Sequence, residues 1–394
     1  MMKNKRFISL CSLLLLSIAG IAQSTFPLND VANPTYSHYA FTNATIVKDA
    51  GTTITNGTLV IKDGKIVAVG QGLKVPAGAI EISATGKYLY PSFIDIYSDY
   101  GTPAQQPRQG GFDFFARSQL TSNTTGAYGW NQAIRPEVDA YKVFAADATK
   151  AKALRDLGFG TVLTHVKDGI ARGTGTVVSL ADEKENLLIL KDKASAHYSF
   201  NKGSSTQSYP NSMMGMIALL RQTYLDAQWY KSRPAKEGVN ISLQAWSEIQ
   251  NLPQIFDAGD KWNNLRADRI GDEAGVQYII KAGGNEYQRM ADIKATKASF
   301  IVTLNYPQAQ DVEDPGDARF VSLTDLKHWE LAPTNPASFE KAGINFCLTA
   351  ADLRDPKTFL TAVRTAINYG LSEKAAMNAL TKNPAELLGI GNLV

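Results

Sequence analysis

The sequence predicts an α/β protein in which a small β module precedes a larger part built from alternating strands and helices. From residue 140 onward, short apolar runs alternate regularly with amphipathic helical segments. Such alternation predicts a parallel sheet, and right-handed crossovers then favour either a closed barrel or an open doubly wound sheet. The β module before it and the lack of a Gly-rich phosphate loop after the first strand favour the barrel.

Composition narrows the class of protein. The 394 residues suffice for one barrel and a small accessory module. A hydrophobic content of 44%, a charged content of 20% and a net charge of +3 are typical of a globular protein. No basic run is long enough to suggest nucleic acid or an anionic membrane surface, so neither is expected as a partner.

The N-terminus has the pattern of a secretory signal peptide over residues 1–22. Lys3, Lys5 and Arg6 precede an apolar run over residues 7–21, which ends in a small-x-small cleavage site. The alternative is an uncleaved anchor helix, but the run is shorter than the ~20 residues that a membrane span needs. We therefore expect a periplasmic or secreted protein without a membrane span after cleavage.

Residues 36–89 are predicted to form an all-β module. Short β-rich runs cover residues 44–47, 57–61 and 65–69, and the Asp63-Gly64 pair between the last two is a hairpin turn signal.

The stretch YPSFIDIYSDYG, residues 90–101, opens the larger part, which we assign to residues 90–394. It predicts a buried strand that ends in polar side chains, among them Tyr97 and Asp99. In an α/β barrel the C-terminal ends of the strands carry the chemistry.

Residues 102–139 follow as a polar insertion with interleaved aromatic residues. We expect either a partly ordered surface loop or an aromatic lid over the mouth of the barrel.

The remaining elements are predicted from apolar runs and from the glycines that end helices. Gly158 and Gly275 each follow an amphipathic segment. Predicted helices cover residues 142–157, part of 209–231, 261–274, 286–296, 356–369 and 372–388, and predicted strands cover 159–164, 176–180, 253–256, 276–280, 299–304 and 345–349.

Several of these segments resemble the amidohydrolase superfamily. Residues 90–101 resemble its signature strand P-G-F-I-D-x-H-x-H, and LVIKDGKIVAVG is typical of its N-terminal sandwich. ALTKNPAELLG, residues 379–389, and residues 158–180 are similar to segments of imidazolonepropionase-like amidohydrolases. The resemblance implies a TIM-like (β/α)8 barrel with a small β-sandwich, and hydrolysis of non-peptide or cyclic amide C–N bonds with zinc as cofactor.

The combination of residues 90–101 with the insertion resembles the N-terminal half of tandem, secreted bacterial amidohydrolase-like proteins. In the superfamily a segment after the last barrel helix completes the sandwich, whereas this sequence ends at Val394. We therefore expect a fragment whose sandwich is the less stable part. Its expected partner is a downstream catalytic amidohydrolase domain.

The metal ligands that the resemblance implies are missing from this sequence. The four His residues, at 38, 165, 197 and 328, do not fall on the superfamily's ligand positions, and no H-x-H or H-E-x-x-H motif occurs. We therefore predict no zinc and no other cofactor. The ligand positions are occupied by Tyr97 and Asp99 for the first His pair, by Asp257 and Gly283 for the later His residues, and by Ala351, or with a one-residue shift Asp352, for the final Asp.

Other residues remain candidates for a site. Asp99, Asp257 and Asp352 are expected either to converge on a hard cation, to act as a metal-free acid/base pair, or to be ordinary loop carboxylates. His165 is either a general base or a His bonded to nearby backbone. The candidate catalytic residues are His165, Asp257 and Asp352, and the candidate pocket residues are Tyr97, Asp99, Arg172 and Asn285.

Arg172 lies among glycines and has two interpretations. It would bind a ligand carboxylate through two hydrogen bonds or form an ion pair with Asp168.

Three functions follow from these patterns. The first is an amidohydrolase-like domain that has lost metal catalysis and acts as a scaffold or binding half. The second is an active hydrolase with a carboxylate-based metal site. The third is an extracytoplasmic binding module for a small-molecule, peptide or glycan ligand. In each case we expect Tyr97, Asp99, Asp257, Asp352 and His165 to share one concavity at the strand ends.

Overall fold

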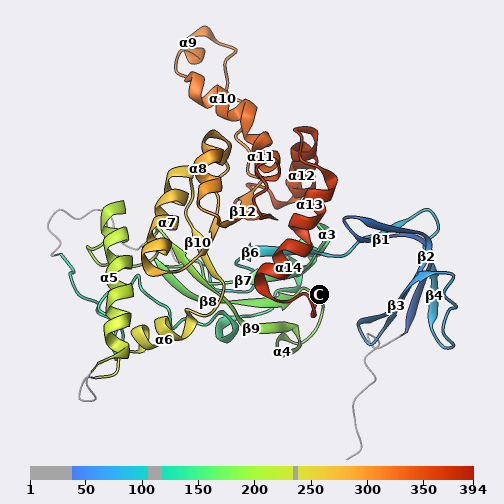
Figure 1. Ribbon diagram of the computed structural model, residues 1–394, viewed down its shortest axis with the longest axis horizontal. Helices are drawn as coiled ribbons and strands as arrows, with labels where there is room; N and C mark the ends of the chain where they lie inside the picture. The colour runs from blue at the N-terminus through green and yellow to red at the C-terminus, as the bar shows by residue number, and fades with distance from the viewer. Residues whose placement is uncertain (1–37, 105–117, 234–237) are drawn as a thin grey trace, which may run out of the picture. The chain divides into compact units, whose positions relative to one another are not determined.

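The computed structural model describes residues 38–104, 118–233 and 238–394 (Figure 1). The chain divides into an N-terminal unit that extends to Leu89 without residues 47–53, and a C-terminal unit that contains Val47–Thr53 and Tyr90–Val394. The predicted signal peptide lies outside the described residues. Among the helices that are described, none is long and apolar enough to cross a membrane.

The N-terminal unit contains one five-stranded sheet with the order β3-β2-β1-β4, in which β5 also pairs with β1. Asp63 and Gly64 both adopt positive φ, as a tight hairpin between β2 and β3 requires. The described residues therefore supply one layer of the predicted sandwich. The strands are β1 (Tyr39–Asp49), β2 (Thr52–Lys62), β3 (Lys65–Gln71), β4 (Ile80–Ser83) and β5 (Tyr88–Leu89).

The C-terminal unit is organised around an eight-stranded sheet in which every strand lies beside its neighbour in the chain. Most of the strands are buried and apolar, so the sheet forms the core of this unit. The strands are β6 (Phe93–Ser98), β7 (Phe159–Thr164), β8 (Ala171–Ser179), β9 (Ile189–Ser199), β10 (Gln254–Asp257), β11 (Tyr278–Lys281), β12 (Ser299–Thr303) and β13 (Phe346–Thr349).

One strand corrects the expectation of a wholly parallel sheet. β8 runs antiparallel to both β7 and β9, whereas the other neighbouring strands are parallel. Only residues 165–170 join β7 to β8, and this segment is too short for a crossover back to the start of a parallel strand. The structure is thus a mixed α/β fold with a largely parallel C-terminal sheet.

Side chains link the first strand of this sheet to the last. The hydroxyl of Thr349 donates to Oδ1 of the buried Asp95 at 2.6 Å, and the backbone N–H of Ala350 donates to Oδ2 at 3.4 Å. Burial raises the pKa of Asp95 to about 6, although the hydrogen bond from Thr349 opposes this shift. The carboxylate of β6 therefore lies against the end of β13.

Helices pack against the sheet through their apolar faces (Figure 1). α3 (Ala148–Asp156) contacts β7, α7 (Lys261–Ala274) contacts β11, and α13 (Glu373–Leu380) contacts β13. α7 begins after its N-cap Asp260 and ends at Gly275 with φ of 70°, as the sequence indicated.

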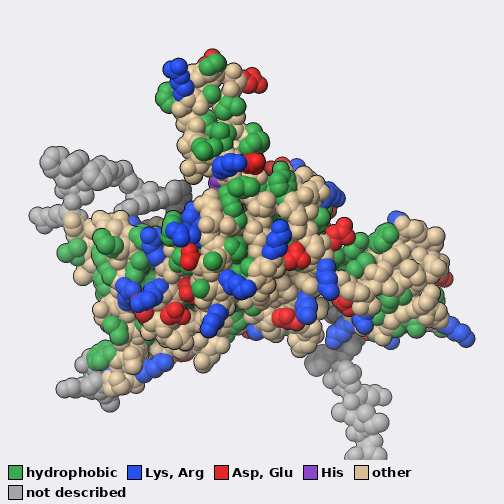
Figure 2. Space-filling view, turned by 45° about the horizontal axis from the view of Figure 1, so that its top comes forward, with side chains coloured by type: hydrophobic (Ala, Val, Ile, Leu, Met, Phe, Trp, Pro, Cys, Tyr) green, Lys and Arg blue, Asp and Glu red, His purple; other side chains and the backbone are tan. Residues whose placement is uncertain are grey.

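The other helices complete the C-terminal unit. Figure 1 shows α9 and α10 projecting as an arm, and Figure 2 shows hydrophobic side chains along this arm, where Phe320 and Leu323 are exposed. These helices are α2 (Ala140–Val143), α4 (Glu185–Leu188), α5 (Met213–Lys231), α6 (Ile241–Ile249), α8 (Met290–Ala295), α9 (Pro315–Ala318), α10 (Leu323–Leu331), α11 (Asn335–Ala342), α12 (Phe359–Asn368) and α14 (Lys382–Leu388).

Candidate functional site

Five polar side chains meet where the strands of the C-terminal sheet end. Parallel strands place their carboxyl ends at one edge, and the antiparallel β8 begins at that same edge. We call this group the strand-end cluster. Its members are Tyr97 in β6, Arg172 in β8, Asp257 at the end of β10, Lys281 at the end of β11 and Asp352 after β13.

Asp257 lies at the centre of the strand-end cluster and accepts three hydrogen bonds. Its Oδ2 accepts from the hydroxyl of Tyr97 at 2.8 Å and from Nη1 of Arg172 at 3.2 Å. Its Oδ1 accepts from Nζ of Lys281 at 3.3 Å. Arg172 also donates to the Tyr97 oxygen at 2.8 Å, so two of the three donors around Asp257 are bonded to each other.

Lys281 joins Asp257 to a second carboxylate. Its Nζ lies 2.5 Å from Oδ2 of Asp352 and 5.1 Å from the ring centroid of Tyr97. Asp352 adopts a φ of 67°, a left-handed conformation that Asp tolerates better than most residues. One ammonium group therefore bridges two of the three carboxylates that were candidates for metal binding.

Burial makes the charges of the strand-end cluster interdependent. The side chains of Arg172 and Lys281 are only 6% and 5% exposed. Burial favours the neutral form of Asp257, but Lys281 and Arg172 outweigh it and hold the pKa of Asp257 below its ordinary value. Burial likewise favours neutral Lys281, but Asp257 and Asp352 outweigh it and raise the pKa of Lys281. Both groups are thus ionised at neutral pH.

Two buried histidines pack against Tyr97. The rings of His165 and His197 stack with centroids 3.7 Å apart, and the Tyr97 ring meets His165 edge-on at 4.7 Å. Both ring nitrogens of His165 are buried and have no hydrogen-bond partner among the described residues, whereas Nε2 of His197 pairs with Oγ of Ser195 at 2.8 Å. His165 is therefore enclosed, which does not suit a general base that must reach a substrate.

The two remaining pocket candidates lie away from the centre of the cluster. Asp99 is 65% exposed and lies 3.7 Å from Nζ of Lys167, which itself lies 5.0 Å from the Tyr97 ring centroid. Asn285 accepts a hydrogen bond from the backbone N–H of Lys261 at 2.9 Å and so holds the start of α7. Asp99 thus lies near the cluster, whereas Asn285 supports a helix end.

Of the two interpretations of Arg172, the ion pair with Asp168 is wrong. Asp168 pairs instead with Arg135 at 2.5 Å and accepts from Ser204, while Arg172 turns to Tyr97 and Asp257.

The residues at the expected ligand positions do not fit zinc. A zinc site needs about three ligand atoms with free lone pairs, and no such group of His, Cys, Asp or Glu occurs among the described residues. Asp257 and Asp352 both face the ammonium of Lys281, which repels any cation placed between them. Gly283 leaves no room for a ligand, because a Cβ there would lie 1.8 Å from the carbonyl oxygen of Gly259.

Sequence reasoning missed Lys281 and His197. Lys281 ends the apolar strand YIIK in the same way that Asp257 ends QIFD, so the strand-end rule would have found it. His197 lies on β9, a strand that the sequence analysis did not include, because Lys191, Asp192 and Lys193 interrupt its apolar pattern.

The buried histidines predict a dependence of stability on pH. Burial lowers the pKa of both His165 and His197 well below 6.5. The next largest cause is the neighbouring His197 for His165 and the charge of Arg172 for His197. Below pH 6.5 the unfolded chain gains protons that the folded chain does not, so the free energy of unfolding should fall as the pH falls. Each histidine contributes up to about 1.4 kcal/mol per pH unit.

This dependence is measured by chemical denaturation between pH 7 and pH 5. We expect His165→Phe to reduce the slope, while His38→Phe in the N-terminal unit leaves it nearly unchanged. Because its pKa is raised to about 6, Asp95 makes the free energy of unfolding change with pH in the opposite direction below about pH 6. All of these variants retain Asp95, so its contribution cancels when their slopes are compared. An unchanged slope in His165→Phe would show that this histidine takes up protons equally in the folded and the unfolded chain, and would contradict the prediction.

Comparison with solved structures identifies proteins of similar fold. No family model and no curated protein matches the chain. Among solved structures, an amidohydrolase from Thermotoga maritima MSB8 is similar, with 20% identity, a TM-score of 0.67 and 89% of each chain covered. A dihydropyrimidinase from Brevibacillus agri NCHU1002 has 13% identity and a TM-score of 0.49 over 90% of this chain and 82% of its own. A prolidase complexed with N-methylphosphonate-L-proline has 13% identity and a TM-score of 0.47 over 90% of this chain and 88% of its own.

At sequence identities this low, structural similarity shows the fold and nothing more. Among these three structures, the Thermotoga maritima amidohydrolase is similar enough to show it. The chain therefore shares the fold of this amidohydrolase over most of its length, as the resemblance of its sequence implied.

Proposed function

We propose that this chain is a catalytically degenerate amidohydrolase-fold protein that acts as a binding or scaffold half. The observation that supports this function is Lys281, whose ammonium at the end of β11 contacts both Asp257 at the end of β10 and Asp352 after β13. Together with Arg172 it supplies fixed positive charge where the superfamily resemblance implies a metal ion. These cations balance the carboxylates without offering a coordination position for water.

Hydrolysis of a C–N bond needs an activated water molecule, and a metal ion supplies it in metal-dependent hydrolases. The groups of the strand-end cluster do not replace that function. Asp257 already accepts three hydrogen bonds and its pKa is lowered, so it is a weak base. His165 is enclosed, and Tyr97 has a pKa raised well above 10 by burial.

The alternative of an active, carboxylate-based metal site is disfavoured by the same ion pairs. A divalent cation bound by Asp257 and Asp352 would have to displace Lys281, whose side chain is 5% exposed and whose ammonium contacts both carboxylates.

The proposal includes closure of the C-terminal sheet into a TIM-like barrel. The hydrogen bonds from Thr349 and Ala350 to Asp95 support this closure, because they hold the last strand against the first. It also includes export to the periplasm or beyond the cell and association with a catalytic amidohydrolase domain.

Hydrolysis assays test the proposed loss of catalysis. The chain should release no product from dipeptides, dihydropyrimidines or hydantoins, either as purified or after incubation with zinc. An active amidohydrolase, assayed in parallel, serves as the positive control for the substrates and buffers. Turnover that a chelator abolishes and added zinc restores would overturn the proposal.

A further inference from the structure

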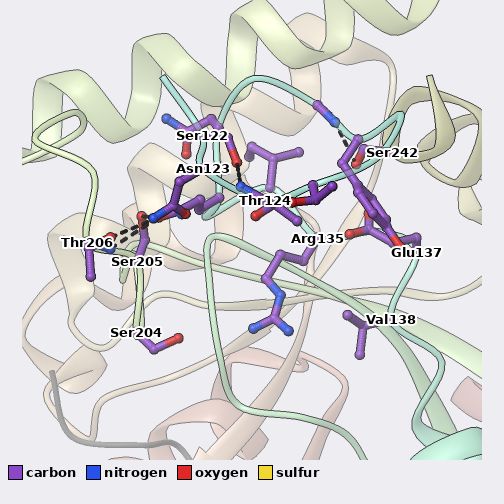
Figure 3. A pocket seen from close by; sticks show the side chains of 16 residues that line it. Ser122, Asn123, Thr124, Arg135, Glu137, Val138, Ser204, Ser205, Thr206 and Ser242 are labelled. Carbon is purple, nitrogen blue, oxygen red and sulfur yellow. Dashed lines mark hydrogen bonds between the residues drawn. The ribbon is translucent and has the colours of Figure 1, made fainter. Parts of the chain in front are cut away.

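A second site lies in the C-terminal unit, where the polar insertion meets the segment after β9 and the start of α6 (Figure 3). It is a hollow of about 780 Å³, a size typical of small-ligand sites. Its walls are rich in hydroxyl and amide groups, and we call it the hydroxyl pocket. Representative lining residues are Ser122, Asn123, Thr124, Gln132, Thr206 and Ser242.

Hydrogen bonds within the walls hold the hydroxyl pocket open. Oε1 of Gln132 accepts from the backbone N–H of Thr206 at 3.2 Å, and the Thr206 hydroxyl donates to Gln119 at 2.9 Å. Oγ of Ser242 accepts from the backbone N–H of Gly129 at 3.1 Å. The insertion is thus fixed to two other segments, so a ligand would meet a preformed wall.

Neither charged residue of the pocket offers a free charge to a ligand. Figure 3 shows Arg135 extending into the pocket, but its guanidinium is already paired with Asp168 at 2.5 Å. Burial raises the pKa of Glu137, which favours its neutral form. Oε2 of Glu137 is buried and lacks a hydrogen-bond partner within the described residues, so the wall of the pocket contains one unpaired acceptor.

One aromatic ring completes the pocket. Tyr128 lines it and is 40% exposed, so its apolar ring face remains accessible beside the polar walls. Hydroxyl groups both donate and accept hydrogen bonds, as the Ser, Thr, Asn and Gln side chains of the wall do. A ring-shaped ligand with many hydroxyls and an apolar face matches both features.

We propose that the hydroxyl pocket binds a neutral saccharide. The inference rests on the proposed function and deepens it, since it names the ligand class of the binding half. A peptide fits less well, because peptide sites rely on an open sheet edge, apolar side-chain pockets or charge clusters. The described lining contains the apolar residues Ile134 and Val138 but is otherwise mainly polar.

Calorimetric titration of the full chain tests this proposal. The probes are neutral oligosaccharides of glucose, xylose, mannose and N-acetylglucosamine, with neutral peptides of similar size as the second arm. We expect at least one saccharide to bind saturably. Glu137→Ala and Tyr128→Ala should each weaken that binding at least tenfold, whereas Tyr369→Ala, an exposed tyrosine outside the pocket, should leave it unchanged.

Three outcomes would overturn the proposal. The first is that the folded chain binds no saccharide. The second is that a saccharide binds but Glu137→Ala and Tyr128→Ala leave its affinity unchanged. The third is that the peptides bind saturably and the saccharides do not. Thermal unfolding of each variant distinguishes a lost contact from a lost fold. None of these results depends on the hydrolysis assays, so failure of the ligand assignment and failure of the proposed loss of catalysis are separable.

Discussion

Replacing Asp257 by Asn is expected to destabilise the chain by about 3–5 kcal/mol, because it leaves two buried cations without their shared counter-charge. Arg172 and Lys281 are almost fully buried and both contact this carboxylate. The Asn side chain keeps the size of Asp and a hydrogen-bond acceptor for Tyr97. The loss measured by chemical denaturation therefore reports mainly on charge.

A matched control and a double variant sharpen this test. Asp99→Asn removes a carboxylate that is 65% exposed, so it should change the free energy of unfolding by no more than about 1 kcal/mol. Adding Lys281→Met to Asp257→Asn removes one of the two buried cations that lack a counter-charge. The free energy of unfolding of the double variant should therefore fall by less than the sum of the two single decreases. Additive losses, or a cost of Asp257→Asn as small as that of Asp99→Asn, would contradict the ion-pair account.

Gly283→Ala is expected to be destabilising by about 1–3 kcal/mol or more, since its new Cβ would overlap a neighbouring backbone oxygen. The built Cβ lies 1.8 Å from the carbonyl oxygen of Gly259, so backbone must move. Gly283→His, which restores the residue type of the superfamily's ligand, should be worse and should not create zinc binding.

Gly391→Ala is the matched control, because a Cβ at that glycine meets nothing within 4 Å. Thermal or chemical unfolding compares the variants. A stable Gly283→His chain that binds zinc would show that one missing histidine, and not the whole cluster, separates this chain from a metal site.

The strand-end rule predicted much of the candidate site. It placed Tyr97, Asp257 and Asp352 at one edge of the sheet, and the structure brings these three residues together. Their positions could be predicted because each lies near or just after the end of a short buried strand. The bounds of α7 were readable for a similar reason, since Asp260 and Gly275 are strong helix start and stop signals.

The partners of these residues could not be read from the sequence. A carboxylate at a strand end binds a metal or an ion-paired cation according to what the neighbouring strand supplies, and that depends on register. Lys281 lies beside Asp257 because the two strands pair Asp257 with Lys281. The sequence also did not predict that β8 runs antiparallel to its neighbours. This direction is what brings Arg172 to the strand-end cluster.

Elemental analysis of the chain purified without chelator tests the central claim most directly. If Lys281 and Arg172 supply the positive charge of the site, the zinc content should be far below one atom per chain. Dialysis against zinc should not raise it, and a chelator should leave the melting temperature unchanged. About one zinc per chain, with a melting temperature that falls on chelation, would contradict the account.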